Sequence, residues 1–591
     1  MAAVKRHAGL ARQAAILAVS GILVRVMGFA YRLPLTALIG DEGNGIYGAS
    51  YNLYMLFLVV SSAGFPTAIS KMVSERVAKR QYHNAHEVFR TCLFLVGGLG
   101  LAASLVLFFG AGFFVWLTNT EEMGTYYSIV ALAPTVFIVA LMAVFRGYFQ
   151  GLSVTTPTAI SQLVEQVFNA VFSVVLAMFF LQTTGGDLAW GAAGGTAGKG
   201  VGAVFGLGTL LFLYFVCAPS IHKRVKKSES LPRENRKDIA KEALYTAFPI
   251  IIGVAVFSIT SIIDTAMVTG ILAGIGWDSE QVSEAFGQLT GKYLPITTLP
   301  VAVATAIASA TIPSIAGSLS VGDIGEANYK INKAVRITMM LCIPAAVGIG
   351  VLADQILLLL FPSFPEGGML LRIGSVSIIF LALAQITTGM LQGCGHMRIP
   401  MYAALVGAGV KVILNSILIP IPGINVLGAV ISTIVCYMVA SGIDLFMLMR
   451  IMGRGARIDL KGLFLKPILA SVVMGFVCFS VYYLFYFSLV GVFGVLLANA
   501  VACIIAVVLG ALSYLIYMVM INGIDEEDLA VFPMGIRINA LVEELGLRPK
   551  PRKLPRPPHP WELPAKPVSL AQRLRRGLAK RRYPARPRNR R

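Results

Sequence analysis

The chain has 591 residues, of which 57% are hydrophobic and only 13% charged, and its formal net charge is +20. A typical soluble domain carries roughly 25% charged residues, so this composition excludes an ordinary water-soluble globule. Apolar runs recur between Ala14 and Met520, and each is long enough to cross a hydrocarbon core of about 30 Å. Because backbone within lipid must satisfy its own hydrogen bonds, the chain is predicted to be an all-α, polytopic membrane protein.

The apolar runs predict about fourteen spanning helices. In chain order the sequence places them near residues 13–39, 46–70, 90–117, 125–150, 157–183, 189–217, 243–273, 286–316, 335–361, 368–394, 399–420, 425–450, 466–487 and 491–521. The sixth contains a glycine-rich stretch at residues 191–208, which indicates close packing between helices through small residues.

Charge alternates along the segments that connect these helices. Lysines and arginines gather near the N-terminus and in the connections at residues 71–90, 223–241, 330–336, 398 and 454–466. The intervening connections contain no lysine or arginine, and the acidic residues among them include Asp41, Glu121, Asp187, Asp278 and Glu366. Since basic loops remain on the cytoplasmic side, the pattern predicts a multi-pass protein with both termini in the cytoplasm.

The sequence also repeats itself at a period of about 245 residues. Pro66 corresponds to Pro313 at an offset of 247, and Gln150 corresponds to Gln392 at an offset of 242. Two copies of a six-helix unit explain these matches. Because six is even, both copies enter the membrane from the same side, so the repeat is parallel and its pseudo-two-fold axis follows the membrane normal.

The repeat divides the chain into five predicted parts. They are an N-terminal six-helix lobe at residues 1–217, a basic cytoplasmic loop at 218–242, a C-terminal six-helix lobe at 243–452, two further helices at 453–522 and a cytoplasmic tail at 523–591. From about residue 548 the tail holds sixteen lysines and arginines, one acidic residue and ten prolines, so we expect it to be disordered. We expect it to bind anionic lipid headgroups, with about 1 kcal/mol from each basic residue. Nucleic acid is not an expected partner, because only Trp561 and Tyr583 could stack on bases.

Three segments resemble a known family. They are residues 25–34 (Arg-Val-Met-Gly-Phe-Ala-Tyr-Arg-Leu-Pro), 145–151 (Phe-Arg-Gly-Tyr-Phe-Gln-Gly) and 411–415 (Lys-Val-Ile-Leu-Asn). Together they resemble the stage V sporulation protein B branch of the polysaccharide transporters. That branch is similar to the MurJ lipid II flippases, in the superfamily that also holds the multidrug and toxin extrusion antiporters. The likeness covers about residues 10–530.

The resemblance implies a V-shaped transporter with two lobes and a central cationic cavity. It implies an undecaprenyl-pyrophosphate-linked sugar as cargo, carried across the cytoplasmic membrane of a bacterium by alternating access. Where the MurJ flippases have an Arg-Asp pair at the end of the first segment, this chain has Tyr31 and Arg32. One cationic residue therefore remains on that turn.

Several cations fall within the apolar segments, where a charge needs a partner, a water-filled cavity or a function. Arg25 and Arg32 are seven positions apart and so share a helix face. Their guanidinium groups suit the oxygens of a pyrophosphate, although snorkelling to the membrane interface is the alternative for each. Lys199 and Lys292 are further buried cations and candidate members of the same substrate site.

The charged residues also indicate two other roles. Glu165 and Lys411 are 246 positions apart at equivalent places in the repeat. They predict either a cross-lobe ion pair that closes the cavity on one side or two unrelated pairs. Asp264 and Asn415 are predicted to lie at one depth in the second lobe, where the resemblance implies a site for Na⁺ or a proton. The alternative is that Asp264 neutralises Lys292.

The sequence therefore favours a flippase for lipid II or a related lipid-linked oligosaccharide. No P-loop, G-x-S-x-G or H-E-x-x-H motif is present, so an enzyme is not expected, and Na⁺ or H⁺ is the only cofactor considered. Cell-wall synthases are candidate partners. The alternative function is a cation-coupled multidrug antiporter, which would require acidic residues in the cavity.

Overall fold

The computed structural model describes residues 20–21, 23–228, 233–320, 322–452 and 461–524. Within these ranges the structure is helical and contains no strand, which confirms the all-α prediction. The helices are α2 (Arg32–Ser62), α3 (Phe65–Ala78), α4 (Tyr82–Phe109), α5 (Ala111–Leu117), α6 (Thr125–Gly151), α7 (Thr156–Thr183), α8 (Leu188–Lys227), α9 (Arg236–Gly274), α10 (Ser279–Gly287), η1 (Gln288–Tyr293), α11 (Leu294–Ser320), α12 (Ile324–Val351), α13 (Ala353–Leu360), α14 (Gly368–Gly374), α15 (Ser377–Gly393), α16 (Arg398–Leu418), α17 (Val426–Met452), η2 (Lys461–Leu465) and α18 (Lys466–Met520). A further helical stretch at residues 23–30 precedes α2.

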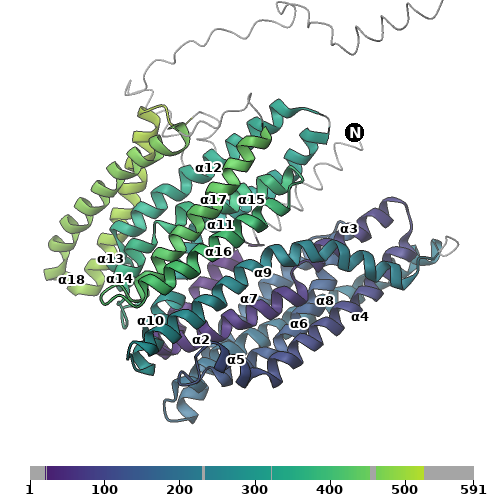
Figure 1. Cartoon of the computed structure of the whole chain (residues 1–591), viewed down its shortest axis with the longest axis horizontal. Helices are drawn as coiled ribbons and strands as arrows, with labels where there is room; N and C mark the ends of the chain where they lie inside the picture. Colours follow the sequence, from purple (N-terminus) through teal and green to yellow (C-terminus); the bar gives the residue numbers. More distant parts are fainter. Residues whose placement is uncertain (1–19, 22, 229–232, 321, 453–460, 525–591) are drawn as a thin grey trace, which may run out of the picture.

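Nine helical segments of the described part are long and apolar enough to cross a membrane, and the bent pair of α14 and α15 would add a tenth. Two of these segments contain a glycine that breaks the helix. Gly40 in α2 has φ 66° and Gly494 in α18 has φ 74°, values that a residue without a Cβ adopts without strain. Figure 1 shows α18 folded back on itself as two antiparallel helices. The count of fourteen stays a prediction.

The helices form two bundles that diverge toward one end of the molecule (Figure 1). The core of the first bundle includes Phe65 of α3, Val88 of α4 and Phe145 of α6. The core of the second includes Val335 of α12 and Ile386 of α15. Because each bundle has a core of its own, the two can be treated as separate packing units.

Helix α9 belongs to both bundles. Ile239 and Ala243 in its first turns are buried in the core of the first bundle. Val268 and Leu272 near its end are buried in a cluster that both bundles share. Pro249 lies between them and removes a helix hydrogen bond. Much of the predicted loop at 218–242 is helical, because α8 continues to Lys227 and α9 starts at Arg236. Packing of α9 against the first bundle continues past residue 243, since Ala247 is also buried in that core.

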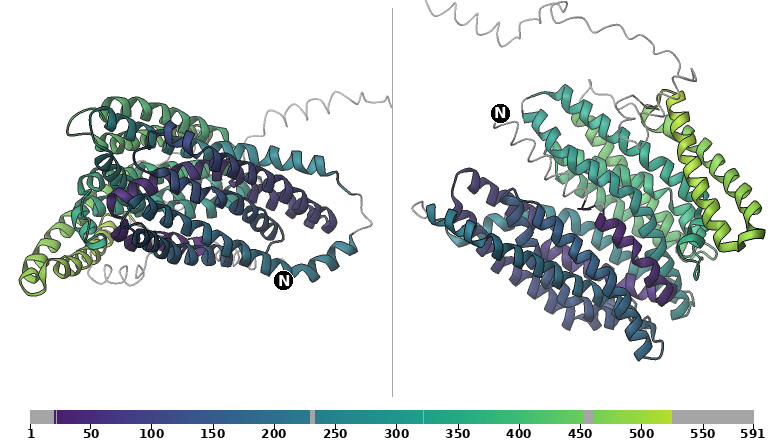
Figure 2. Two further views of the ribbon diagram at one scale, coloured as in Figure 1. Left: turned by 90° about the horizontal axis from the view of Figure 1, so that it is seen from below. Right: turned by 180° about the vertical axis from the view of Figure 1, so that it is seen from behind.

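The bundles make their closest contact where α2 meets α10 and η1. A Cβ placed on Gly45 would lie 2.1 Å from the carbonyl oxygen of Ser283. A Cβ placed on Gly48 would lie 2.2 Å from Oγ1 of Thr290. Only glycine permits such an approach, so this end of the molecule is closed by direct helix contact. The right-hand view in Figure 2 shows the bundles apart at the other end. The predicted tail from residue 548 lies outside the described residues.

Candidate transport site

A buried carboxylate at the centre of the first bundle binds two cations. Glu165 of α7 accepts a hydrogen bond from Nη2 of Arg146 at 2.9 Å and another from Nζ of Lys199 at 2.9 Å. Nε of Arg146 also donates to Oγ of Ser161 at 3.1 Å. The three charged side chains are 11–17% exposed, so they lie largely out of contact with solvent or lipid. Two cations around one carboxylate leave the cluster with a net positive charge.

Glycines of α8 bring Lys199 to this position. A Cβ on Gly198 would lie 2.2 Å from the backbone nitrogen of Ser173, and one on Gly202 would lie 2.5 Å from the carbonyl oxygen of Glu165. Helices α7 and α8 can therefore pack backbone to backbone. This confirms the expectation that the glycine-rich stretch packs helices together, and it places the Lys199 side chain beside the Glu165 carboxylate.

Lys292 occupies the closed end of the molecule. It is 1% exposed, and its Nζ donates to Oδ2 of Asp41 at 2.6 Å. The same amine donates to the carbonyl oxygens of Phe364 at 2.6 Å and Glu366 at 3.0 Å. All three of its hydrogens are thus accounted for. In this conformation Lys292 is a contact between the bundles, and its assignment to a substrate site stays a prediction.

Asp264, Lys411 and Asn415 come together on α9 and α16. Nζ of Lys411 forms an ion pair with Oδ2 of Asp264, and Nδ2 of Asn415 donates to Oδ1 of Asp264 at 3.0 Å. Asp264 and Lys411 line a small pocket between the bundles, together with Asn52 of α2 and Tyr437 of α17. The structure therefore brings the two members of the predicted cation site together, and it adds a lysine as their counter-ion.

Of the two alternatives for Glu165 and Lys411, the structure shows the two unrelated pairs and not the cross-lobe ion pair. Each residue has its partners within its own repeat unit, Glu165 on α6 and α8 and Lys411 on α9. Equivalent positions of a repeat are related by rotation, so they occupy corresponding places in separate lobes and need not touch. The suggested pairing of Asp264 with Lys292 is likewise absent, because Lys292 binds Asp41.

Arg25 and Arg32 have no acidic partner among the described residues. The Arg25 side chain is exposed. One turn after it, Gly28 lies close to α7, since a Cβ there would be 3.2 Å from Nε2 of Gln166. Arg32 donates to the carbonyl oxygen of Thr290 at 3.1 Å and lies over the ring of Tyr47 at 5.6 Å. No carboxylate in the part of the chain that the structure describes therefore compensates the charge of either arginine.

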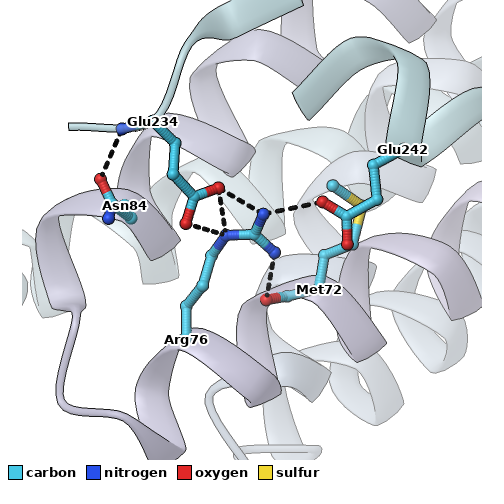
Figure 3. A network of polar contacts seen from close by, with 5 residues as sticks. All are labelled: Met72, Arg76, Asn84, Glu234 and Glu242. Atoms are coloured by element: carbon cyan, nitrogen blue, oxygen red, sulfur yellow. Dashed lines mark hydrogen bonds and ion pairs between the residues drawn. The ribbon is translucent and has the colours of Figure 1, made fainter. Parts of the chain in front are cut away.

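A further ion-pair network joins α9 to the first bundle at the open end (Figure 3). Nε of Arg76 on α3 donates to Oε1 of Glu234 at 3.0 Å, and its Nη2 donates to Oε2 of Glu242 at 2.8 Å. The backbone nitrogen of Glu234 donates to Oδ1 of Asn84 at 3.3 Å. The contacts fix the start of α9 on α3 and α4.

Sequence reasoning missed Arg146, Asp41 and Arg76 as members of charged clusters. Of these, Arg146 could have been recognised from the sequence, because a charge within the apolar run of 125–150 requires a partner. Asp41 was assigned to an external connection and Arg76 to a basic loop. Only the fold reveals that each meets a residue more than 150 positions away.

Two helical bundles with ionised side chains inside apolar helices define a multi-pass membrane transporter. The chain belongs to the family of polysaccharide biosynthesis proteins, whose profile matches residues 10–318. The profile of the MatE family matches residues 249–417. Both matches place the chain in the superfamily that holds flippases and multidrug transporters.

Similar proteins are known from Bacillus subtilis strain 168. The chain is 26% identical over 478 residues to its lipid II flippase MurJ, an alignment that covers 78% of this chain and 87% of the relative. It is 24% identical over 420 residues to its stage V sporulation protein B, covering 71% and 79%. These relatives are bacterial, and this chain is a multi-pass membrane protein like them.

Solved structures share the fold. A multidrug resistance transporter in an inward-facing conformation superposes with a TM-score of 0.62 at 16% identity, covering 74% of this chain and 98% of the other. A lipid II flippase MurJ in an inward closed conformation gives a TM-score of 0.60 at 17% identity, covering 85% and 98%. The fold is thus common to transporters of very different cargo.

Proposed function

We propose that this protein is a flippase that moves a lipid-linked cell-wall precursor, lipid II or a related undecaprenyl-pyrophosphate oligosaccharide, by alternating access. The observation that carries the proposal is the uneven distribution of charge. In the first bundle Arg146 and Lys199 share the carboxylate of Glu165, and Arg25 and Arg32 have no acidic partner among the described residues. An excess of cations suits a cargo whose headgroup carries a pyrophosphate.

Guanidinium groups are the side chains best matched to phosphate oxygens, because they present several donors in one plane. We assign Arg25 and Arg32 as the primary ligands, since no carboxylate among the described residues competes for them. Lys199 contributes through the net charge of the Glu165 cluster. Lys292 is left out of the substrate site in this conformation because Asp41 and two carbonyl groups hold it.

The orientation follows from the basic connections, which we place in the cytoplasm together with both termini of the chain. The closed end then faces outward, since Asp41 and Glu366 belong to the acidic connections. In this orientation the end at which the bundles diverge (Figure 2) faces the cytoplasm. Translocation requires the contacts around Lys292 to open and the opposite end to close.

We further propose that Asp264 and Asn415 form the coupling site and that Lys411 holds it in the absence of an external cation. A tethered ammonium and a Na⁺ ion or proton would neutralise the same carboxylate in turn. This exchange would make occupancy of the site depend on the conformation of α9. We assign the basic tail to anionic lipid headgroups and to cell-wall synthases.

The competing function is export of cationic drugs, which the MatE match over residues 249–417 favours. A cationic drug requires an acidic residue free to receive it. Asp264 is occupied by Lys411 and Asp41 by Lys292. The arginines of the first bundle would repel such a cargo, so the charge distribution favours the anionic one.

Complementation tests the proposal. The gene is expressed in a bacterial strain in which the resident lipid II flippase is depleted, beside an empty vector. Growth with the gene and lysis with the vector support the proposal. Lysis in both, with the protein present in the membrane at normal abundance, would contradict lipid II as the cargo.

A further inference from the structure

A groove opens on the first bundle, away from the contacts between the bundles. Helices α4, α6 and α8 and the first turn of α9 form it. Its lining combines aromatic side chains, such as Phe94 and Phe215, with two arginines, Arg90 and Arg236. No part of the proposed transport mechanism uses this groove.

The wall of the groove is aromatic. The ring of Tyr214 stacks on Phe89 with 5.3 Å between centroids and meets Phe145 edge-on at 5.7 Å. At the outer surface Phe94 is 78% exposed and Phe215 is 67% exposed. Exposed aromatic side chains on a spanning helix face the acyl chains of the bilayer, so this wall is a surface for hydrocarbon.

The two arginines lie at the same end of the groove, on either side of one carboxylate. Nε of Arg236 donates to Oε2 of Glu87 at 3.1 Å, and Nη1 of Arg90 lies 3.7 Å from Oε1 of Glu87. The side chains of Arg90 and Arg236 are 53% and 66% exposed, whereas that of Glu87 is 13% exposed. Glu87 therefore holds the two guanidinium groups near each other, and these three side chains together carry a net charge of +1.

We propose that this groove binds an anionic phospholipid. Its phosphate lies between Arg90 and Arg236, and an acyl chain lies on the aromatic wall. Arginine presents paired donors that match phosphate oxygens, and the net positive charge selects an anionic headgroup over a zwitterionic one. The apolar wall commits the site to a lipid, because a soluble phosphate would gain nothing from Phe94 and Phe215.

The two arginines are on different helices, so a lipid that binds both would link those helices. Arg90 is on α4 and Arg236 is the first residue of α9. A phosphate bound by both ties the start of α9 to the first bundle, as the contacts of Arg76 with Glu234 and Glu242 also do. The bound lipid stabilises the conformation in which α9 begins on that bundle.

Lipid retention measured by native mass spectrometry tests the site. The full chain is titrated with phosphatidylglycerol and with phosphatidylcholine of the same acyl chains. Each basic residue near an anionic lipid contributes about 1 kcal/mol, or about fivefold in affinity. The double variant Arg90→Ala and Arg236→Ala should therefore bind phosphatidylglycerol about 25-fold more weakly, and the double lysine variant should keep part of the affinity.

The matched control is Arg450→Ala, an exposed arginine near the end of α17. It should leave lipid binding unchanged. Equal retention by the wild type and the double alanine variant would overturn the proposal. The proposal would also be overturned if glycerol phosphate raised the unfolding temperature of the wild type as much as phosphatidylglycerol does, because the site would then bind soluble anions. Thermal unfolding without added lipid checks that all three variants are folded.

Discussion

Lys292 and Asp41 form an ion pair across the junction of the two bundles, with 2.6 Å between Nζ and Oδ2. They are 251 positions apart in the sequence, and both side chains are at most 5% exposed. Two backbone carbonyl groups complete the coordination of the lysine amine. A contact so fully satisfied closes one end of the molecule, and transport requires it to break.

Removing one partner of this pair should destabilise the protein. Lys292→Met leaves Asp41 buried without a counter-ion, which costs about 3–5 kcal/mol. The double variant with Asp41→Asn should recover part of that loss, because no charge is then left alone. Thermal unfolding in detergent measures the effect. The exposed pair of Arg372 and Asp354 is the control, and Arg372→Met should cost about 0–1 kcal/mol. A double variant as unstable as the sum of the single changes would contradict the account.

Arg25 should be essential for transport but not for folding. Arg25→Ala removes a guanidinium group that no described carboxylate binds, so we expect complementation to be lost at normal membrane abundance. Arg25→Lys should rescue it in part, because the charge remains but the paired donors are lost. Arg450→Ala serves as the control for removal of an exposed arginine. Full complementation by Arg25→Ala would exclude a role in binding.

The membrane fold and the positions of the buried charges could be predicted from the sequence, but the partners of those charges could not. The apolar runs predicted the all-α membrane fold, because length and hydropathy alone determine whether a segment can cross a bilayer. They also identified Arg32, Lys199, Lys292 and Lys411 as charges that need partners. The partners themselves depend on how helices pack, and sequence offered only the repeat as a guide.

The repeat offered a cross-lobe pair of Glu165 and Lys411 as one of two alternatives, and the structure shows the other alternative, two unrelated pairs. Glu165 and Lys411 correspond in the repeat, but each binds within its own bundle. Asp264 and Asn415 were instead predicted to be close because they lie at the same depth in one lobe. In the structure Nδ2 of Asn415 lies 3.0 Å from Oδ1 of Asp264. Asp41 could not be recognised, because the Gly40 break that places it against Lys292 appears only in the folded chain.

Asp264 should control any ion dependence of transport. In proteoliposomes, Asp264→Asn removes the carboxylate that a Na⁺ ion or proton would neutralise, so transport should no longer respond to Na⁺ or pH while cargo binding persists. Lys411→Met removes the internal counter-ion and should lower the Na⁺ concentration that is needed. Unchanged ion dependence in Asp264→Asn would reduce the residue to a structural partner of Lys411.

The tail should act on membrane association rather than on transport. Deleting residues 548–591 removes sixteen basic residues, so binding to anionic vesicles in a flotation assay should weaken. Complementation should continue, because transport needs only the helices. The truncated chain should also keep the lipid retention that depends on Arg90 and Arg236. A truncated protein that inserts normally but fails to complement would make the tail part of the transport cycle.

Translocation by the purified protein tests the central claim most directly. Lipid II carrying a labelled headgroup is reconstituted with the full chain in liposomes, and its appearance at the outer face is followed with a membrane-impermeant reagent. We predict that the wild type accelerates translocation over protein-free liposomes and that Arg25→Ala does not. Absence of acceleration by the wild type, together with export of a cationic dye by the same liposomes, would contradict the flippase assignment.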